Sequence, residues 1–220
     1  MKYDTVIFDM DGTILYTLDD LTDAVNYAMA KVGLKLREVE EIRGFVGNGI
    51  KKLVERCMPE NYSKELFERA YEYFSEYYKE HCYDKTRAYD GVNGLIGELR
   101  AKGLKTAVVS NKDDYGVKTL CEVFFKGLFD SQKGVRENLA KKPAPDLCEE
   151  ALKELKSEKK NAVYVGDSDV DFLTAKNSGL DFIGVSWGFK GREFLKNLGA
   201  ENIADTPSDV KAFIFGDENV

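Results

Sequence analysis

The chain has 220 residues and a formal net charge of −7, with 43% hydrophobic and 32% charged residues. This composition is typical of a globular protein, and the length suits one core domain that carries an insertion. An excess of acidic residues without a basic tract argues against nucleic acid as a partner. No stretch approaches the roughly 18 apolar residues of a membrane span, and no export signal is evident. We therefore expect a cytoplasmic protein that binds no membrane and whose four scattered cysteines are reduced thiols.

Two carboxylates follow the first predicted strand, which spans residues 3–8. The sequence there is Asp9-Met-Asp11-Gly-Thr. Residues two apart in an extended chain point to the same face, so both carboxylates project together from the strand's end. Such a pair repels unless a cation lies between its members, and Mg²⁺ prefers oxygen ligands. An acidic turn is the alternative interpretation, because Asp and Gly are common turn residues.

A long segment with helical periodicity follows. Between residues 16 and 83 the apolar and aromatic residues recur at helical spacing, and no convincing strand interrupts them. The first helix ends at Gly33, and Thr17 with Asp20 resembles a capping box at its start. The only histidine, His81, falls in the last helix of the segment. We predict a small helical bundle inserted into the chain.

Strands and helices alternate after Gly91. Strands are expected over residues 106–109, 162–165 and 182–185, with amphipathic helices between them. This alternation predicts an α/β fold in which a parallel sheet has helices on both faces.

Three of the predicted strands end in polar residues of similar kinds. In an open parallel sheet, ligands bind outside the carboxyl ends of the strands, so these side chains can meet in one crevice. Lys142 precedes Pro-Ala-Pro and adds one positive charge on a stiff loop. The strand-end residues are Asp9 with Asp11, Ser110 with Asn111, and Asp167 with Asp171.

These motifs, taken in order, resemble those of the haloacid dehalogenase superfamily of hydrolases. The resemblance covers nearly the whole chain and implies a Rossmann-like core (residues 1–15 and 84–220) with an inserted α-helical cap domain (residues 16–83). Within the superfamily, the segment 43–56 and the Trp-Gly-Phe sequence at 187–189 resemble phosphoglycolate phosphatases. Two departures are Tyr-Thr at positions 16–17, where the family often has Asp-Ser, and the missing proline before the turn at position 91.

The resemblance implies Mg²⁺-dependent hydrolysis of a small phosphate monoester, with 2-phosphoglycolate as the expected substrate. Asp9 would attack phosphorus and form an aspartyl phosphate, while Asp11 would serve as general acid and then as base. Asp171 would orient Lys142 or a metal-bound water. The other implied ligands are Asp9, the main-chain carbonyl of Asp11 and Asp167 for the metal, and Ser110, Asn111 and Lys142 for the phosphate.

A glycine-rich stretch in the predicted cap has two interpretations. It is a tight turn between helices, or it meets the far end of the substrate when the cap closes. In the second case the residues that determine substrate specificity are Arg43, Gly47, Asn48 and Gly49.

Other functions share part of this pattern. A phosphomutase or an inorganic pyrophosphatase would keep all four motifs, and only the cap favours phosphoglycolate. A receiver-type signalling module also combines a strand-end Asp, a Ser or Thr and a Lys around Mg²⁺, but such a module is much shorter than this chain. The expected partner is a small phosphorylated metabolite, bound by a monomer or a homodimer.

Overall fold

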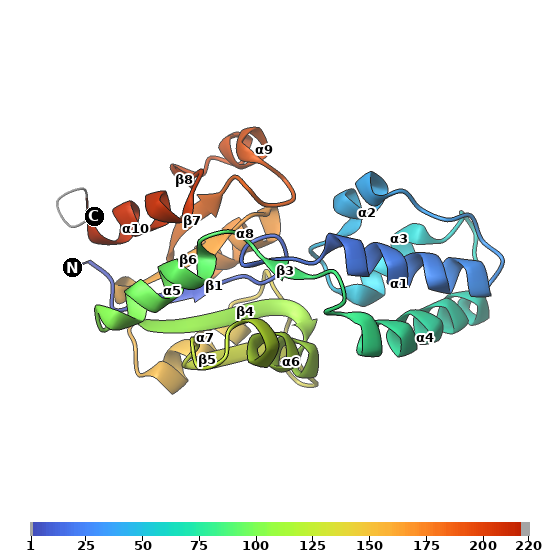
Figure 1. The fold of residues 1–220 in the computed structure, drawn as a ribbon, viewed down its shortest axis with the longest axis horizontal. Helices are drawn as coiled ribbons and strands as arrows, with labels where there is room; N and C mark the ends of the chain where they lie inside the picture. The colour runs from blue at the N-terminus through green and yellow to red at the C-terminus, as the bar shows by residue number, and fades with distance from the viewer. Residues whose placement is uncertain (1, 217–220) are drawn as a thin grey trace. The chain divides into compact units, whose positions relative to one another are not determined.

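The computed structural model describes residues 2–216, which divide into two compact units (Figure 1). We call residues 1–15 and 88–220 the core unit and residues 16–87 the cap unit. The sequence analysis placed the second boundary after residue 83, whereas the chain re-enters the core unit after residue 87. The two chain crossings run through β2 (Leu15–Tyr16) and β3 (Arg87–Ala88), which pair as a two-stranded sheet.

The core unit is built on a six-stranded parallel sheet with the order β5-β4-β1-β6-β7-β8. The chain extends from β1 to β4 and β5 on one side, and then to β6, β7 and β8 on the other. The strand order therefore reverses at β1, where open α/β sheets form their ligand-binding crevice. This architecture confirms the predicted α/β class. The strands are β1 (Thr5–Phe8), β4 (Lys105–Asp113), β5 (Ser131–Val135), β6 (Ala162–Gly166), β7 (Asp181–Val185) and β8 (Asn202–Ala204).

Apolar side chains cover both faces of this sheet. Ile7, Ala107 and Val109 pack with the apolar face of α7 in one buried cluster. Val6 and Val108 are one residue out of phase, so they point to the opposite face, and they are fully buried as well. The core helices are α5 (Val92–Ala101), α6 (Asp114–Phe124), α7 (Asp146–Leu155), α8 (Asp169–Ser178), α9 (Arg192–Asn197) and α10 (Pro207–Phe215), with a 3₁₀ turn at Lys159–Asn161.

Some elements lie where the sequence analysis assigned none. Strand β5 reads Ser-Gln-Lys-Gly-Val and has no apolar run, and β8 has only three residues. Strand β4 is longer than the predicted 106–109, because its polar end, Ser110–Asp113, continues the extended backbone. Both differences arise because pairing with a neighbouring strand outweighs local propensity.

The cap unit is helical. It consists of α1 (Leu18–Lys31), α2 (Val39–Phe45), α3 (Ile50–Cys57) and α4 (Lys64–His81). The helices pack through apolar stripes, and Tyr27 of α1 stacks on Tyr77 of α4 with ring centroids 4.6 Å apart. In the described part of the protein, no helix combines the length and the apolar character that a membrane span requires. All four cysteines are buried free thiols.

The predicted capping box at the start of α1 is wrong. Thr17 occupies the N-cap position, but its side chain makes no capping hydrogen bond. The Asp20 carboxylate, which is buried, instead accepts hydrogen bonds from the Lys85 N–H (2.9 Å) and the Thr86 N–H (2.8 Å). These donors are more than 60 residues away, so a local pattern could not reveal them. Asp20 ties the first turn of α1 to the last segment of the cap unit.

Replacing Asp20 with Ala should lower the free energy of unfolding by roughly 2–3 kcal/mol, because two backbone N–H groups lose a charged acceptor. Urea unfolding followed by far-UV circular dichroism measures this effect, since the cap unit is helical. Asp23→Ala is the matched control. Asp23 pairs with the Lys85 side chain at the surface, and loss of such a pair costs about 0–1 kcal/mol. Equal losses in the two variants would contradict the anchoring role of Asp20.

Candidate active site

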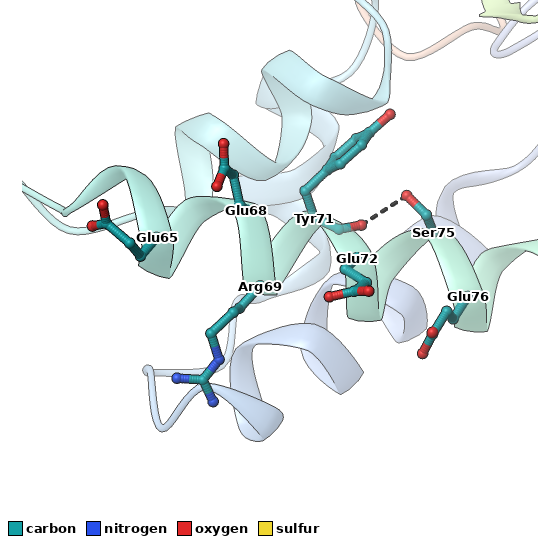
Figure 2. Close-up of a pocket in the computed structure, with 7 residues that line it drawn as sticks. All are labelled: Glu65, Glu68, Arg69, Tyr71, Glu72, Ser75 and Glu76. Atoms are coloured by element: carbon teal, nitrogen blue, oxygen red, sulfur yellow. Dashed lines mark hydrogen bonds between the residues drawn. The ribbon is translucent and has the colours of Figure 1, made fainter.

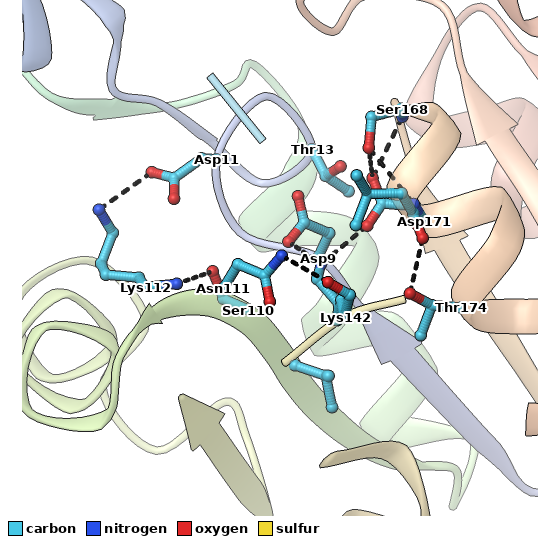
Figure 3. Close-up of polar contacts among 12 residues, drawn as sticks. Asp9, Asp11, Thr13, Ser110, Asn111, Lys112, Lys142, Ser168, Asp171 and Thr174 are labelled. Atoms are coloured by element: carbon cyan, nitrogen blue, oxygen red, sulfur yellow. Dashed lines mark hydrogen bonds and ion pairs between the residues drawn. The ribbon is translucent and has the colours of Figure 1, made fainter. Parts of the chain in front are cut away.

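Polar side chains from three neighbouring strands meet at the carboxyl edge of the core sheet (Figure 3). Asp9 follows β1, Ser110 and Lys112 lie at the end of β4, and Asp167 follows β6. Lys142 enters on the loop before α7, and its Nζ lies 2.6 Å from Asp9 Oδ1. The parallel order of the strands brings these distant segments together.

Lys142 is surrounded by acceptors. Its Nζ donates to Asp9 Oδ1 (2.6 Å), Asp171 Oδ1 (2.8 Å) and the Tyr164 hydroxyl (2.9 Å). An ammonium group has three N–H donors, so each one has a partner. Burial alone would lower the pKa of Lys142, but the two carboxylates outweigh it and hold this pKa above its usual value. The ammonium therefore stays charged.

Asp171 links Lys142 to the start of α8. Its Oδ2 accepts from the Ser168 hydroxyl (2.6 Å), from the Ser168 N–H (3.1 Å) and from the Asp167 N–H (3.2 Å). The Ser168 hydroxyl in turn accepts from the Asp171 N–H, which completes a capping box. Asp171 Oδ1 accepts from Lys142, and Asp171 Oδ2 accepts from donors at the start of α8. Both oxygens of this carboxylate therefore have hydrogen-bond donors.

Two glycines let loops close around Asp167. A Cβ atom on Gly12 would lie 2.6 Å from Asp167 Oδ2, and one on Gly188 would lie 2.2 Å from Asp167 Cβ. The loop after β7 also supplies the Phe189 N–H, which donates to Asp167 Oδ2 at 2.7 Å. Trp187 of the same loop donates its Nε1–H to the main-chain carbonyl of Thr13 (3.0 Å). Only residues without a side chain fit at these two glycine positions.

The site carries more negative than positive charge. Oxygens of Asp9, Asp167 and Asp171 come within 4.8 Å of one another, and Asp11 pairs with Lys112 at 3.3 Å. Four carboxyl groups outnumber two ammonium groups, so full ionisation leaves two negative charges uncompensated. Burial, with repulsion from neighbouring carboxylates, raises the pKa of Asp9 to about 7 and that of Asp167 well above its usual range. Hard oxygen donors with this charge balance suit a divalent cation.

The metal ligands predicted from the sequence differ in one residue from the carboxylate cluster of the structure, which consists of Asp9, Asp167 and Asp171. The prediction used the main-chain carbonyl of Asp11, and the Asp11 side chain points to Lys112 instead of joining the cluster. Asp171 completes the cluster, although its oxygens are already occupied by Lys142 and by the start of α8.

Ser110 and Asn111, predicted to bind phosphate, are buried beside Lys142. One amide N–H of Asn111 donates to the main-chain carbonyl of Lys142 (3.1 Å), and the Ser110 hydroxyl accepts from the Lys112 N–H (3.2 Å). Both side chains therefore also fix the backbone of the site.

The predicted specificity residues belong to the cap unit, where Arg43 lies in α2 and Gly47, Asn48 and Gly49 lie between α2 and α3. Arg43 makes an ion pair within α2 at 2.9 Å. Arg56 of α3 donates to Asn48 Oδ1 at 2.7 Å. Gly47 and Gly49 have φ angles of 119° and 83°, and Gly49 is the N-cap of α3. Glycine is required here because these φ angles are left-handed.

A surface groove along α4 is unsuited to bind a phosphorylated ligand. The exposed acidic side chains that line it would repel an anion (Figure 2). Its lining residues are Glu65, Glu68, Arg69, Tyr71, Glu72, Ser75 and Glu76.

Two residues of the site were not identified from the sequence. Tyr164 lies inside an apolar strand. A buried tyrosine hydroxyl needs a hydrogen-bond partner, so a tyrosine at this position could have indicated a polar neighbour. It donates to the main-chain carbonyl of Val109 at 3.1 Å and accepts from Lys142. Lys112 shares a strand face with Ser110 two residues earlier, a spacing that could have indicated it.

Comparison with known proteins agrees with this geometry. The pattern of the haloacid dehalogenase-like hydrolase family matches residues 6–185. Phosphoglycolate phosphatase of Psychrobacter arcticus is 31% identical over 206 residues, which covers 90% of each chain. A Caldanaerobacter subterraneus subsp. tengcongensis protein, provisionally named a pyrophosphatase, is 30% identical over 198 residues (89% of this chain and 87% of that one). A crystal structure from Lactobacillus delbrueckii subsp. bulgaricus, provisionally named a phosphoglycolate phosphatase, gives a TM-score of 0.93 at 39% identity, covering 98% of this chain and 100% of that one.

The chain therefore belongs to the haloacid dehalogenase-like hydrolases, as its motifs predicted. It is a phosphatase, and its relatives include phosphoglycolate phosphatases.

Replacing Gly188 with Ala should displace Asp167 and lower the hydrolysis of p-nitrophenyl phosphate on the order of 100-fold, because small misplacements at a reacting centre are costly. Gly97→Ala is the matched control. Gly97 lies within α5, where a Cβ atom meets nothing within 4 Å, so alanine should leave activity unchanged and favour the helix. Full activity of a folded Gly188→Ala variant would contradict a tight fit around Asp167.

Proposed function

We propose that this protein is a Mg²⁺-dependent phosphatase that hydrolyses a small phosphate monoester, 2-phosphoglycolate in particular, through an aspartyl phosphate on Asp9. The observation that carries the proposal is the 2.6 Å contact between Lys142 Nζ and Asp9 Oδ1 beside the carboxylate of Asp167. A nucleophile that must approach an anion needs an adjacent positive charge, and this contact provides one. The phosphoglycolate phosphatase-like relatives support the choice of substrate.

Asp9 and Asp11 divide the chemistry between them. An oxygen of Asp9 attacks phosphorus while the ester P–O bond breaks, and Asp11 donates a proton to the leaving oxygen. Asp11, now a carboxylate, then takes a proton from water, whose oxygen attacks the phosphorus of the aspartyl phosphate. The P–O bond to Asp9 breaks, and inorganic phosphate and the free carboxylate result.

The remaining polar residues hold the phosphoryl group and the lysine. Ser110 and Asn111 supply donors to the phosphoryl oxygens, and Lys142 shares with these oxygens the N–H that it donates to Asp9. Asp171 and Tyr164 keep the Lys142 ammonium beside Asp9, because they occupy its other two N–H groups. Asp171 also fixes this arrangement to the backbone at the start of α8.

The carboxylates of Asp9 and Asp167 and the main-chain carbonyl of Asp11 would hold Mg²⁺. The two uncompensated negative charges of the site and its hard oxygen donors support this assignment. When bound, the ion neutralises charge between the nucleophile and the phosphoryl oxygens.

Substrate specificity is assigned to residues of the cap unit. Arg43, Gly47, Asn48 and Gly49 of the cap unit remain the predicted contacts for the far end of the substrate. A pyrophosphatase is the second candidate function, because one relative carries that provisional name. A phosphomutase or a receiver-type module has no such support among the relatives described above. The cytoplasmic location and the monomer or homodimer stay predictions.

Asp9→Asn should lower phosphatase turnover at least about a thousandfold, since the neutral amide cannot attack phosphorus. The measurement is phosphate release from p-nitrophenyl phosphate with Mg²⁺, and circular dichroism verifies the fold. Asp169→Asn is the matched control, because this half-exposed residue begins α8 two residues after Asp167 and does not join the carboxylate cluster. Substantial activity of Asp9→Asn would assign the nucleophile elsewhere.

Chelation should abolish hydrolysis, and added Mg²⁺ should restore it, because the uncompensated acidic charge needs a cation. A panel of phosphate monoesters, sugar phosphates and pyrophosphate, assayed with Mg²⁺ and with chelator, measures both metal dependence and substrate choice. We expect 2-phosphoglycolate among the better substrates. Background rates with 2-phosphoglycolate alongside good turnover of pyrophosphate or a hexose phosphate would replace the substrate assignment.

A further inference from the structure

Trp187 belongs to the Trp-Gly-Phe sequence at 187–189 and has no task in the proposed mechanism. It follows β7 on a loop that is anchored at its start, where the Ser186 N–H donates to the main-chain carbonyl of Ala204 in β8 (2.9 Å). The half-buried indole donates its N–H to the main-chain carbonyl of Thr13 at 3.0 Å. Because this N–H is the only polar group of a tryptophan side chain, its one acceptor fixes the direction of the indole.

Thr13 lies on the turn that follows β1 and also carries Asp11 (Figure 3). Within residues 10–15, the Met10 carbonyl accepts from the Thr13 N–H (3.3 Å) and from the N–H groups of the next two residues, which makes the turn compact. Thr13 is buried, and its hydroxyl donates to Asp167 Oδ1 at 3.3 Å. A displacement of Thr13 would therefore move the turn that holds Asp11.

The proposed nucleophile and the proposed acid are held by different contacts. The Asp9 N–H donates to the main-chain carbonyl of Val165 (2.9 Å), which extends the pairing of β1 with β6, and its carboxylate accepts from Lys142 (2.6 Å). Asp11 lies two residues further along, in the turn that the indole of Trp187 contacts. Loss of the indole hydrogen bond should therefore displace Asp11 and leave Asp9 in place.

The Thr13 carbonyl supplies the physical reason for such a displacement. A buried acceptor that loses its donor is unfavourable, so the turn should shift until the carbonyl meets water or another donor. A small shift of a group that must exchange a proton with the substrate is enough to slow the reaction.

We propose that Trp187 is a positioning residue which, through the Thr13 carbonyl, holds Asp11 where it can protonate the leaving oxygen. The inference rests on the proposed function, in which Asp11 is the general acid. A general acid contributes most when the leaving group is basic, because a basic oxyanion departs with difficulty unless it receives a proton. Trp187 should therefore matter more for esters with basic leaving groups.

The test compares two esters in Trp187→Phe, a variant that keeps an aromatic ring and removes the donor. We measure kcat/KM with Mg²⁺ for phenyl phosphate and for p-nitrophenyl phosphate, because phenoxide is the more basic leaving group. This parameter covers the steps up to departure of the leaving group, so the later hydrolysis of the aspartyl phosphate does not enter it. We expect kcat/KM to fall roughly 10-fold for phenyl phosphate and about twofold for p-nitrophenyl phosphate.

Asp11→Asn is the reference variant for this pattern. It should also lose more on phenyl phosphate than on p-nitrophenyl phosphate, and the loss on phenyl phosphate should be on the order of 100-fold, as expected for removal of a general acid.

Tyr3→Phe is the matched control. The Tyr3 hydroxyl donates to Asp181 Oδ2 (2.7 Å) at the start of β7, at the opposite end of this strand from Trp187. Removing this aromatic donor should leave kcat/KM for both esters unchanged.

A tryptophan analogue provides a second way to remove the donor if Trp187→Phe does not fold. In 3-(benzothiophen-3-yl)alanine, sulfur replaces the indole N–H and the shape of the ring is kept. Because Trp187 is the only tryptophan of the chain, a tryptophan-auxotrophic host places the analogue at this position alone. The same unequal loss on the two esters is expected.

The outcomes separate the inference from the proposed function. Equal losses on the two esters in folded Trp187→Phe, no loss, or a larger loss on p-nitrophenyl phosphate would overturn the positioning role. Equal losses in Asp11→Asn would overturn the general-acid role of Asp11, and the inference would fall with it.

Discussion

The ammonium group of Lys142 organises the carboxyl edge of the sheet. It is buried, and its three N–H groups contact Asp9, Asp171 and Tyr164. Two buried carboxylates could not lie this close without a cation between them, and a buried lysine could not stay charged without them. The Lys142 ammonium and the two carboxylates therefore keep one another charged. The strand order at β1 supplies the geometry, since it brings the ends of β1, β4 and β6 to one place.

The site has two charged regions with different partners. Around Lys142, every N–H has a protein acceptor, and the arrangement is tied to the backbone through the start of α8. Around Asp11, one partner is Lys112, whose stem passes close to Gly116 in the first turn of α6. In the proposed mechanism, the region around Lys142 holds the nucleophile Asp9, and the other region holds Asp11, the proposed general acid.

Site residues at strand ends can be predicted from the sequence. Elements and contacts that form only by pairing with segments distant in the chain cannot. Asp9 and Asp167 are recognisable because a parallel sheet brings the carboxyl ends of its strands together, and Lys142 is recognisable from the Pro-Ala-Pro that follows it. β5 and β8 are not, because they are short or polar and extend only through pairing with neighbours. The same limit explains the wrong capping box at Thr17, since the donors to Asp20 come from the far end of the cap unit.

The loop after β7 has a practical consequence. Trp187 is the only tryptophan of the chain, and its indole is bonded to Thr13, a residue that itself donates to Asp167. The tryptophan fluorescence of the protein therefore originates beside the acidic cluster of the core unit, and no tryptophan of the cap unit adds to it. An optical reporter is thus built into the chain, and titration of an ion or a phosphate analogue can be followed without attaching a dye.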